Sequence, residues 1–470
     1  EGGMTVKNSI AMKVLILTLG MSLSGAAFAE LGDYGFWRTL VNLASPPKAD
    51  NPVTEAQRQG DYPLQANPAG FNDGFSPGKY YEWQTVKLSA ETGAVCGNGS
   101  EYKFFVNRVP NTSNTVVYME GGGACWDYES CSGQTGIRGA RNPDGIPDDY
   151  MNIANPSASL VSPFVVRLNP LSSVKTQNWN MVYIPYCTGD IYSGDRVAVY
   201  DDPTGDAPPL VWHHNGLRNN RAVVSWVKDH LQRPKQMLAT GCSAGGIGSL
   251  TNYQPMRRDI APTRGFLIDD SGPAFQAPLD GDPAQYPSVP LQTLIRDAWG
   301  LDEASGPLAY LKSGMPLLDL NDLGPLYTAL ATALPSDRMG HTHFWQDLNF
   351  SAYSYERFYD DIQNAPSEAA KEQLLHDRWH VDTDRLLSQL SNLDNFGYFM
   401  PWYRGVNESH CSTIIEFANS DIQEAGLEMD DFVDNVLNGS GAVMQASETD
   451  QQADYNKPFN AFYWLLGQIL

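Results

Sequence analysis

The chain has 470 residues, of which 42% are hydrophobic and 18% are charged, an ordinary composition for a globular protein. Its 54 acidic residues outnumber 31 basic residues and give a formal net charge of −23 at pH 7. A strongly anionic surface repels other polyanions, so this charge argues against nucleic acids and anionic membranes as partners.

Residues 1–29 have the pattern of a secretory signal peptide. After the first residue, the only charged side chains in this segment are Lys7 and Lys13, and a short apolar run at 14–19 follows them. Residues 27–29 read Ala-Phe-Ala, which is typical of a cleavage site. The alternative is a membrane anchor, but the apolar run is shorter than a transmembrane helix requires. We therefore expect a secreted or periplasmic protein without stable membrane insertion.

Residues 30–78 are rich in Pro, Gly, Asn and Asp, and we expect them to form an irregular N-terminal wrap around a catalytic domain spanning residues 79–470. Short apolar runs predict strands at 102–107, 115–120, 180–185, 236–240, 264–268 and 342–345. Helical patterns are predicted at 220–231 and 428–437, and a helical insertion or cap at 280–334. Strands that alternate with helices predict an α/β fold with a doubly wound, mostly parallel sheet.

Ser243 lies in a Gly-x-Ser-x-Gly motif at residues 241–245, directly after predicted strand 236–240. A serine hydroxyl is a weak nucleophile until a base accepts its proton, and a sharp strand-to-helix turn exposes it for this purpose. Glycines on both sides permit such a strained turn. The motif therefore predicts that Ser243 is a nucleophile in an α/β-hydrolase fold; the alternative is a glycine-rich turn without chemistry.

Three consecutive glycines, residues 121–123, end the predicted strand at 115–120. A glycine run at this place can turn backbone N–H groups towards a developing oxyanion. We expect Gly122 or Gly123 to act together with the N–H group of Ala244. A phosphate-binding loop is the alternative, but the Lys and Ser/Thr residues that such a loop requires do not follow.

The general base is expected to be a histidine that follows Ser243 in the chain. The histidines in that part of the sequence are His341, His343, His376, His380 and His410. His341 and His343 alternate along a predicted strand, which is typical of structural residues. His376 and His380 are four residues apart and resemble a metal-binding pair, but no third ligand is evident. His410 is the last of the set and lies in a loop-like stretch.

The cysteines provide an argument for His410. Six cysteines in an exported chain predict three disulfides, and there is no Cys-x-x-Cys spacing that would favour zinc. Cys242 precedes Ser243 directly, and Cys411 follows His410 directly. A Cys242–Cys411 disulfide would bring the two loops together, because the Cα atoms of a disulfide lie close to each other.

The acid of the expected triad has several candidates. Asp347 follows the predicted strand 342–345, where a late strand of the sheet would deliver it, and we select it to orient the imidazole. Asp269 and Asp270 follow the preceding strand and are rivals. Asp360 and its neighbour Asp361 are further alternatives.

Taken together, these segments resemble the pectin acetylesterase family, which includes the Notum carboxylesterases. The matching stretches are 95–100, 120–125 with Cys131, 180–187 with Asp190 and 193–194, 241–246, 269–272 and 410–411. They extend over most of the expected mature chain. The family usually carries its acid in an Asp-x-x-Gln pattern, but the corresponding stretch here, 351–358, contains no Asp. Either the acid has moved to Asp347, or another stretch of this sequence corresponds to the pattern.

The resemblance implies an α/β-hydrolase fold, hydrolysis of a carboxylic ester and a triad of Ser243, His410 and an Asp. It implies an oxyanion hole from Gly122, Gly123 and Ala244, and it suggests Cys125–Cys131 and Cys96–Cys187 disulfides. We expect an acyl-enzyme reaction without metal or organic cofactor, acting on a short-acyl ester, namely an acetylated polysaccharide or another small acyl ester. The alternatives are a lipid- or polyester-cleaving hydrolase, favoured by a large apolar pocket near 280–334, and an inactive carbohydrate-binding protein.

Overall fold

A computed structural model describes residues 62–135, 139–151, 162–167, 173–405 and 407–449. The expected signal peptide, residues 1–29, lies outside the described residues, as does the expected N-terminal wrap up to residue 61. From residue 62 to residue 82 the chain forms turns and irregular structure without a helix or strand. None of the helices within the described ranges is long and apolar enough to cross a membrane.

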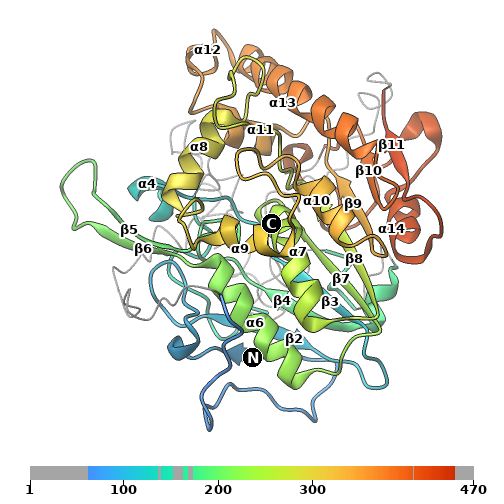
Figure 1. Ribbon diagram of the computed structural model, residues 1–470. Helices are drawn as coiled ribbons and strands as arrows, with labels where there is room; N and C mark the ends of the chain where they lie inside the picture. Colours follow the sequence, from blue (N-terminus) through green and yellow to red (C-terminus); the bar gives the residue numbers. More distant parts are fainter. Residues whose placement is uncertain (1–61, 136–138, 152–161, 168–172, 406, 450–470) are drawn as a thin grey trace, which may run out of the picture.

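A nine-stranded sheet forms the centre of the molecule (Figure 1). Its strands, in spatial order, are β1 (Trp83–Lys87), β2 (Lys103–Asn107), β4 (Asn180–Ile184), β3 (Thr115–Met119), β7 (Gln236–Cys242), β8 (Arg264–Asp270), β9 (Arg338–Thr342), β10 (Phe396–Met400) and β11 (Gln445–Ser447). β1 pairs antiparallel with β2, and β2 pairs antiparallel with β4; every other pair in this sheet is parallel. The predicted mostly parallel α/β sheet is therefore confirmed.

The α-helices are α4 (Tyr128–Cys131), α6 (Gly216–His230), α7 (Ala244–Ile260), α8 (Val289–Ala298), α9 (Pro307–Gly314), α10 (Leu326–Ala333), α11 (Leu348–Tyr355), α12 (Asp360–Gln363), α13 (Glu368–Leu390) and α14 (Met429–Asn438). Short 3₁₀ turns are η2 (Ala90–Thr92), η4 (Lys175–Asn178), η5 (Asn407–Ser409) and η6 (Gln423–Ala425). Three helices, α8 to α10, occupy the stretch where an insertion was expected.

Helices cover both faces of the sheet, as β8 illustrates. A Cβ atom on Gly265 would meet Tyr253 and Arg257 of α7. The next residue, Phe266, points to the opposite face, because successive strand residues alternate. There Lys175 lies over its ring and donates a hydrogen bond to the carbonyl of Leu437, the penultimate residue of α14. α7 and α14 therefore cover opposite faces.

The central strands consist of β-branched and apolar residues that are buried throughout. All five residues of β3 and of β4 are buried, which is the expected pattern for parallel strands covered on both faces. Among the predicted strands, the one at 342–345 is wrong. The strand β9 spans Arg338–Thr342 instead, and a run with Arg, Gly and His gives no hydrophobic signal although it is buried between β8 and β10.

A separate two-stranded hairpin of β5 (Arg196–Tyr200) and β6 (Leu210–His214) projects from the body of the molecule (Figure 1). The base of β6 is anchored, because Trp212 is buried and donates its indole N–H to the carbonyl of Thr188. The chain then enters α6, which packs against α7. The C-terminal ends of β3, β7, β8 and β9 lie at one edge of the sheet, which is where parallel α/β proteins place their sites.

Candidate active site

Ser243 forms the turn between β7 and α7. It follows Cys242, the last residue of the strand, and precedes Ala244, the first residue of the helix. Its backbone has φ 58° and ψ −125°, a conformation that residues with a Cβ rarely adopt. Its N–H donates to the carbonyl of Asp270 at 2.9 Å, which fixes the turn against β8. This is the strand–turn–helix context that the motif predicted for an exposed nucleophile.

Two glycines after Ser243 allow α7 to start close to the sheet. A Cβ on Gly245 would lie 2.0 Å from the carbonyl oxygen of Met119, and a Cβ on Gly246 would lie 2.2 Å from that of Asp270. Both distances are far below van der Waals contact. The glycines are therefore required by the approach of α7 to β3 and β8, which aims the first turn of the helix at the site.

The glycine loop after β3 lies directly against Ser243. A Cβ on Gly121 would be 3.2 Å from the Cβ of Ser243. Gly122 and Gly123 have φ values of 140° and 67°, which favour glycine. Among the described residues, the N–H groups of Gly122, Gly123 and Ala244 donate no backbone hydrogen bond. Three backbone donors near one hydroxyl form the arrangement expected of an oxyanion hole.

A buried ion pair supports this loop. Glu120, which is 1% exposed, accepts hydrogen bonds from the Tyr150 hydroxyl and from the N–H of Tyr186 at 3.0 Å. Its carboxylate lies 3.0 Å from Nε of Arg141, whose aliphatic carbons pack against Gly122. Glu120 was predicted only as the end of a strand, and its role in holding the loop was missed.

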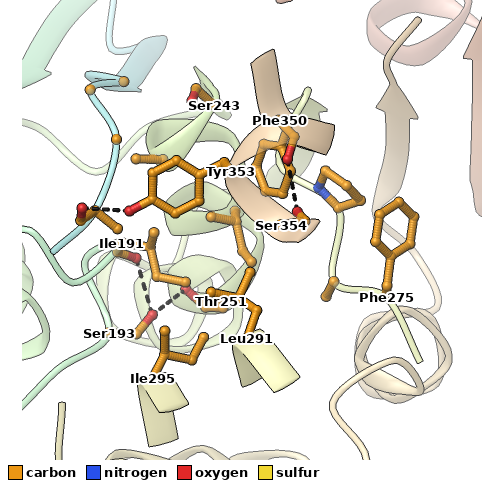
Figure 2. A pocket seen from close by; sticks show the side chains of 18 of the residues that line it. Ile191, Ser193, Ser243, Thr251, Phe275, Leu291, Ile295, Phe350, Tyr353 and Ser354 are labelled. Atoms are coloured by element: carbon orange, nitrogen blue, oxygen red, sulfur yellow. Dashed lines mark hydrogen bonds between the residues drawn. The ribbon is translucent and has the colours of Figure 1, made fainter. Parts of the chain in front are cut away.

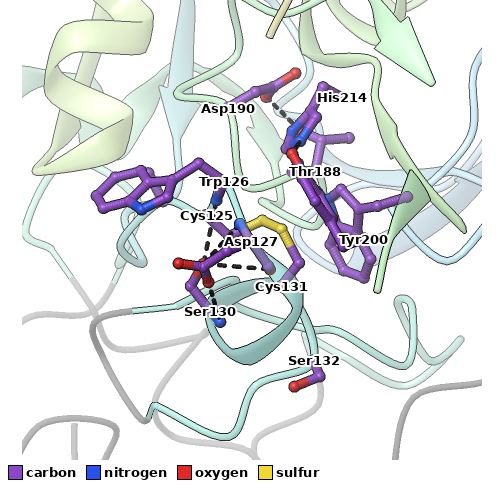
Figure 3. Close-up of a disulfide and its surroundings, with 12 residues drawn as sticks. Cys125, Trp126, Asp127, Ser130, Cys131, Ser132, Thr188, Asp190, Tyr200 and His214 are labelled. Atoms are coloured by element: carbon purple, nitrogen blue, oxygen red, sulfur yellow. Dashed lines mark hydrogen bonds between the residues drawn. A yellow bond between two sulfur atoms is a disulfide. The ribbon is translucent and has the colours of Figure 1, made fainter. Parts of the chain in front are cut away.

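The Cys125–Cys131 disulfide joins the two ends of the segment 125–131, which begins two residues after the glycine loop (Figure 3). Between the two cysteines, Asp127 caps the short helix α4 by accepting from the N–H of Ser130 at 2.8 Å. Cys125 is also tied to the body of the protein, because its N–H donates to the carbonyl of Gly189 at 2.7 Å. These contacts place Trp126 at the wall of the pocket described below.

His410 and Asp347 form a buried pair. Nδ1 of His410 lies 2.8 Å from Oδ2 of Asp347, and the two residues are 5% and 0% exposed. Asp347 is also the N-cap of α11, where Oδ1 accepts from the N–H of Phe350 at 2.9 Å. The carboxylate is therefore held from two sides and orients the imidazole, leaving Nε2 free to act on a neighbouring group.

The loop of His410 is linked to the loop of Ser243 by the Cys242–Cys411 disulfide, with Cα atoms 5.7 Å apart. A ring nitrogen of His410 and the sulfur atoms of both cysteines lie within 4.8 Å of one another. Because these sulfur atoms form a disulfide, they are not thiolate ligands for a metal. The third bond, Cys96–Cys187, joins the segment before β2 to the loop after β4. Cys242–Cys411 is the pair expected from the positions of the cysteines, and the other two pairs are those that the family resemblance suggested.

The other acids and histidines take different places. Asp269 is bonded to His341, with 2.7 Å between Oδ2 and Nδ1, and Nε2 of His341 lies 2.7 Å from His343. Asp270 contacts the backbone after Cys411 rather than an imidazole. Asp360 is exposed at the start of α12, together with Asp361. His376 and His380 stack on α13, and no group of metal-binding residues within the described ranges includes them.

The pKa values of the buried residues His343 and His410 are shifted in opposite directions. Burial lowers the pKa of His343 well below its ordinary value, so this ring is neutral at pH 7. Burial also opposes the charged form of His410, but the charge and hydrogen bond of Asp347 outweigh it and raise the pKa of His410 above its ordinary value. An imidazole that gains stability on protonation beside a fixed carboxylate has the property required of a general base.

A pocket opens at Ser243 and is lined mainly by apolar side chains (Figure 2). It encloses about 180 Å³ and includes Ser243, His410 and the glycine loop. Its apolar wall comes from the loop after β4, from α8 and from α11, with Ile191, Leu291, Ile295, Phe350 and Tyr353 among the lining residues. Tyr353 donates to the carbonyl of Ala124, which joins α11 to the glycine loop. The contribution of α11 was missed, because its residues show no distinct helical pattern.

This chain is similar to a known family model, to curated proteins and to a solved structure. Residues 76–273 match the family model described as pectinacetylesterase. The matched residues include the glycine loop and Ser243, whereas Asp347 and His410 lie beyond them.

Two curated relatives illustrate the similarity. A palmitoleoyl-protein carboxylesterase NOTUM from Drosophila melanogaster is 25% identical over 229 residues, which are 48% of this chain and 32% of that relative. Pectin acetylesterase 4 from Arabidopsis thaliana is 29% identical over 178 residues, 37% of this chain and 39% of that relative. The chain thus spans well under half the length of these relatives.

The structure of the Wnt deacylase Notum from Drosophila matches with a TM-score of 0.50 at 18% identity, covering 79% of this chain and 98% of that chain. At this identity the likeness shows the fold alone. The chain therefore has a Notum-like fold, in which a mostly parallel sheet carries helices on both faces, consistent with the expected α/β-hydrolase class.

Proposed function

We propose that this protein is a serine carboxylic-ester hydrolase with Ser243 as nucleophile, His410 as general base and Asp347 as the orienting acid. One observation carries the proposal. Ser243 sits on a strained strand–helix turn in the same pocket as a histidine whose Nδ1 is held by a buried carboxylate. Nucleophile, base and orienting group are the parts that acyl transfer requires.

The proposed reaction has two steps. Nε2 of His410 accepts the proton of Ser243 as Oγ attacks the ester carbonyl, and the oxyanion accepts hydrogen bonds from Gly122, Gly123 and Ala244. His410 then protonates the leaving alcohol, and an acyl-enzyme remains. Water, deprotonated by His410, attacks the acyl group and releases the carboxylic acid and free serine. Each of these steps is supplied by side chains and backbone amides.

The pocket favours an apolar acyl group longer than acetyl. Its wall carries leucine, isoleucine and aromatic side chains from α8 and α11, and such a surface gains free energy with each methylene that it buries. An acetyl group would leave most of this surface uncovered. The relatives named palmitoleoyl-protein carboxylesterase are consistent with this choice.

An acetylated polysaccharide is the second candidate substrate. The relatives named pectin acetylesterase support it, and the family match covers the nucleophile and the glycine loop. In both cases the three disulfides and the pattern of residues 1–29 favour an exported enzyme.

A fluorophosphonate probe tests the proposal, because it phosphonylates only a serine that a base has activated. We expect stoichiometric labelling of the parent protein and none of Ser243→Ala. Ser193→Ala is the matched control, since Ser193 lines the same pocket and is expected to be dispensable for labelling. Absence of labelling in folded parent protein would favour the inactive carbohydrate-binding alternative. Release of acetate from acetylated pectin, measured beside the cleavage of nitrophenyl esters, distinguishes the two substrate classes.

A further inference from the structure

The loop that carries His410 has a backbone conformation that its residues do not favour by themselves. Asn407, Glu408, Ser409 and Cys411 have φ values of 50°, 53°, 57° and 66°. None of them is a glycine, and such conformations persist only where the surrounding structure holds them. The position of His410 therefore depends on contacts that the loop makes with the rest of the protein.

Those contacts converge on the carboxylate of Asp270, the last residue of β8, which is 0% exposed. Its Oδ1 accepts from both the N–H and the hydroxyl of Ser412, each at 2.9 Å. Its Oδ2 accepts from both the N–H and the hydroxyl of Thr413, each at 2.7 Å. Four donors from the two residues after Cys411 are thus bound to one buried side chain.

The same residue also contacts the nucleophile. The backbone carbonyl of Asp270 accepts the N–H of Ser243 at 2.9 Å. The neighbouring Ser271 hydroxyl accepts the N–H of Cys411 at 3.0 Å and donates to Oδ1 of Asp270 at 3.1 Å. The end of β8 is therefore bonded to the Ser243 turn through its backbone and to the His410 loop through its side chains.

We propose that Asp270 is a positioning residue, which sets the place of the His410 imidazole relative to the Ser243 hydroxyl by binding the loop of one and the turn of the other. This inference rests on the proposed function and adds a second carboxylate to it. Asp347 orients the ring about its own axis, whereas Asp270 determines where the ring lies. A displacement of about 1 Å between reacting groups costs on the order of 10²-fold in rate.

Several charged groups act on His410. Asp347 faces it from the start of α11, Asp270 from β8, and Glu408 from its own loop, and all three favour the protonated ring. His343, just beyond β9, also lies within electrostatic range. Asp270→Asn removes one of these negative charges and leaves the other groups in place. The variant is therefore expected to lower the pKa of His410 as well as to displace the loop.

The experiment compares Asp270→Asn with Asp337→Asn. Asp337 is also a buried carboxylate, which accepts from the Tyr253 hydroxyl at 2.9 Å and from Nε of Arg257 at 2.7 Å, and it does not line the pocket. In Asp270→Asn we expect kcat for a nitrophenyl ester to fall about 100-fold, with KM unchanged. The acid limb of its kcat/KM profile shifts to lower pH. Asp337→Asn is expected to keep the kcat and the pH profile of the parent.

Thr413→Val provides a second variant, since it removes one hydroxyl donor and retains the shape of the side chain. We expect the same separation of kcat from KM, with a fall in kcat of about tenfold, the effect of losing one hydrogen bond. This variant decides the question if Asp270→Asn does not fold. Unchanged kcat in folded Thr413→Val, or equal losses in Asp270→Asn and Asp337→Asn, would overturn the proposal.

An independent readout separates this proposal from the proposed function. The pKa of His410 can be measured by NMR of ¹³C-labelled histidine, with the resonance assigned through His410→Gln. A displaced His410 resonance in Thr413→Val, which removes a hydroxyl group and no charge, supports the positioning role even if the parent cleaves no ester. A resonance and pKa identical to those of the parent in both folded variants contradict the role. Absence of esterase activity in the parent contradicts the proposed function alone.

Discussion

The apolar pocket predicts how activity depends on acyl length. Each methylene that moves from water to an apolar wall gains about 0.8 kcal/mol, which corresponds to roughly a fourfold rise in kcat/KM. From an acetyl to a hexanoyl ester, four methylenes are added, so the expected total is about 3 kcal/mol, or roughly 200-fold. The ordering of the chain on binding lowers this figure, which is therefore an upper value.

The matching variant is Ile295→Trp, which fills the pocket. Ile295 is 7% exposed, lies on α8 and lines the apolar wall (Figure 2). We expect the preference for hexanoyl over acetyl to fall to about 15-fold or less, as two or more methylenes lose their site. Acetyl ester hydrolysis should stay close to that of the parent, because Ser243 and the glycine loop are not altered.

Leu294→Trp is the control for this variant, since Leu294 lies on the same helix and does not line the pocket. The assay is the initial rate of hydrolysis of nitrophenyl esters from acetyl to octanoyl, below their solubility limits. A kcat/KM that does not rise with chain length in the parent would refute the reasoning. So would an equal effect of the two tryptophan variants on chain-length preference.

Three further predictions concern the site and its supports. Asp347→Asn is expected to lower kcat roughly 10³- to 10⁴-fold and to shift the acid limb of the kcat/KM profile to lower pH, because the carboxylate that raises the pKa of His410 is lost. Steady-state rates equal to those of the parent across the pH range would contradict this. Replacing Cys242 and Cys411 together by Ala removes a disulfide between residues that are 169 positions apart in the chain. We expect the free energy of unfolding in denaturant to fall by up to about 5 kcal/mol, and an unchanged unfolding midpoint would contradict this. Gly245→Ala places a Cβ 2.0 Å from the carbonyl oxygen of Met119, so soluble yield and melting temperature should fall well below those of the parent, and a normally stable variant would show that α7 can move away.

Much of the fold was predictable because its signals are local. The buried strands β3, β4, β7 and β8 are continuous apolar runs, and such runs identify parallel strands without knowledge of their partners. β9 was misplaced, because it is buried by its neighbours rather than by its own apolar pattern. β10, β11 and the α11 segment, which interact with distant parts of the chain, were not predicted.

For the site, the sequence by itself determined the turn at Ser243 and the glycine loop, because steric demands on a few consecutive residues leave a distinct pattern. It also indicated the Cys242–Cys411 link, since each cysteine is adjacent to a candidate catalytic residue. Only the tertiary structure decided which carboxylate faces His410. Asp269 and Asp270 end β8 and Asp347 follows β9, and their partners depend on how distant loops pack above the edge of the sheet. The apolar pocket was decided in the same way, because its wall is assembled from α8, α11 and the loop after β4, which meet only when the chain is folded.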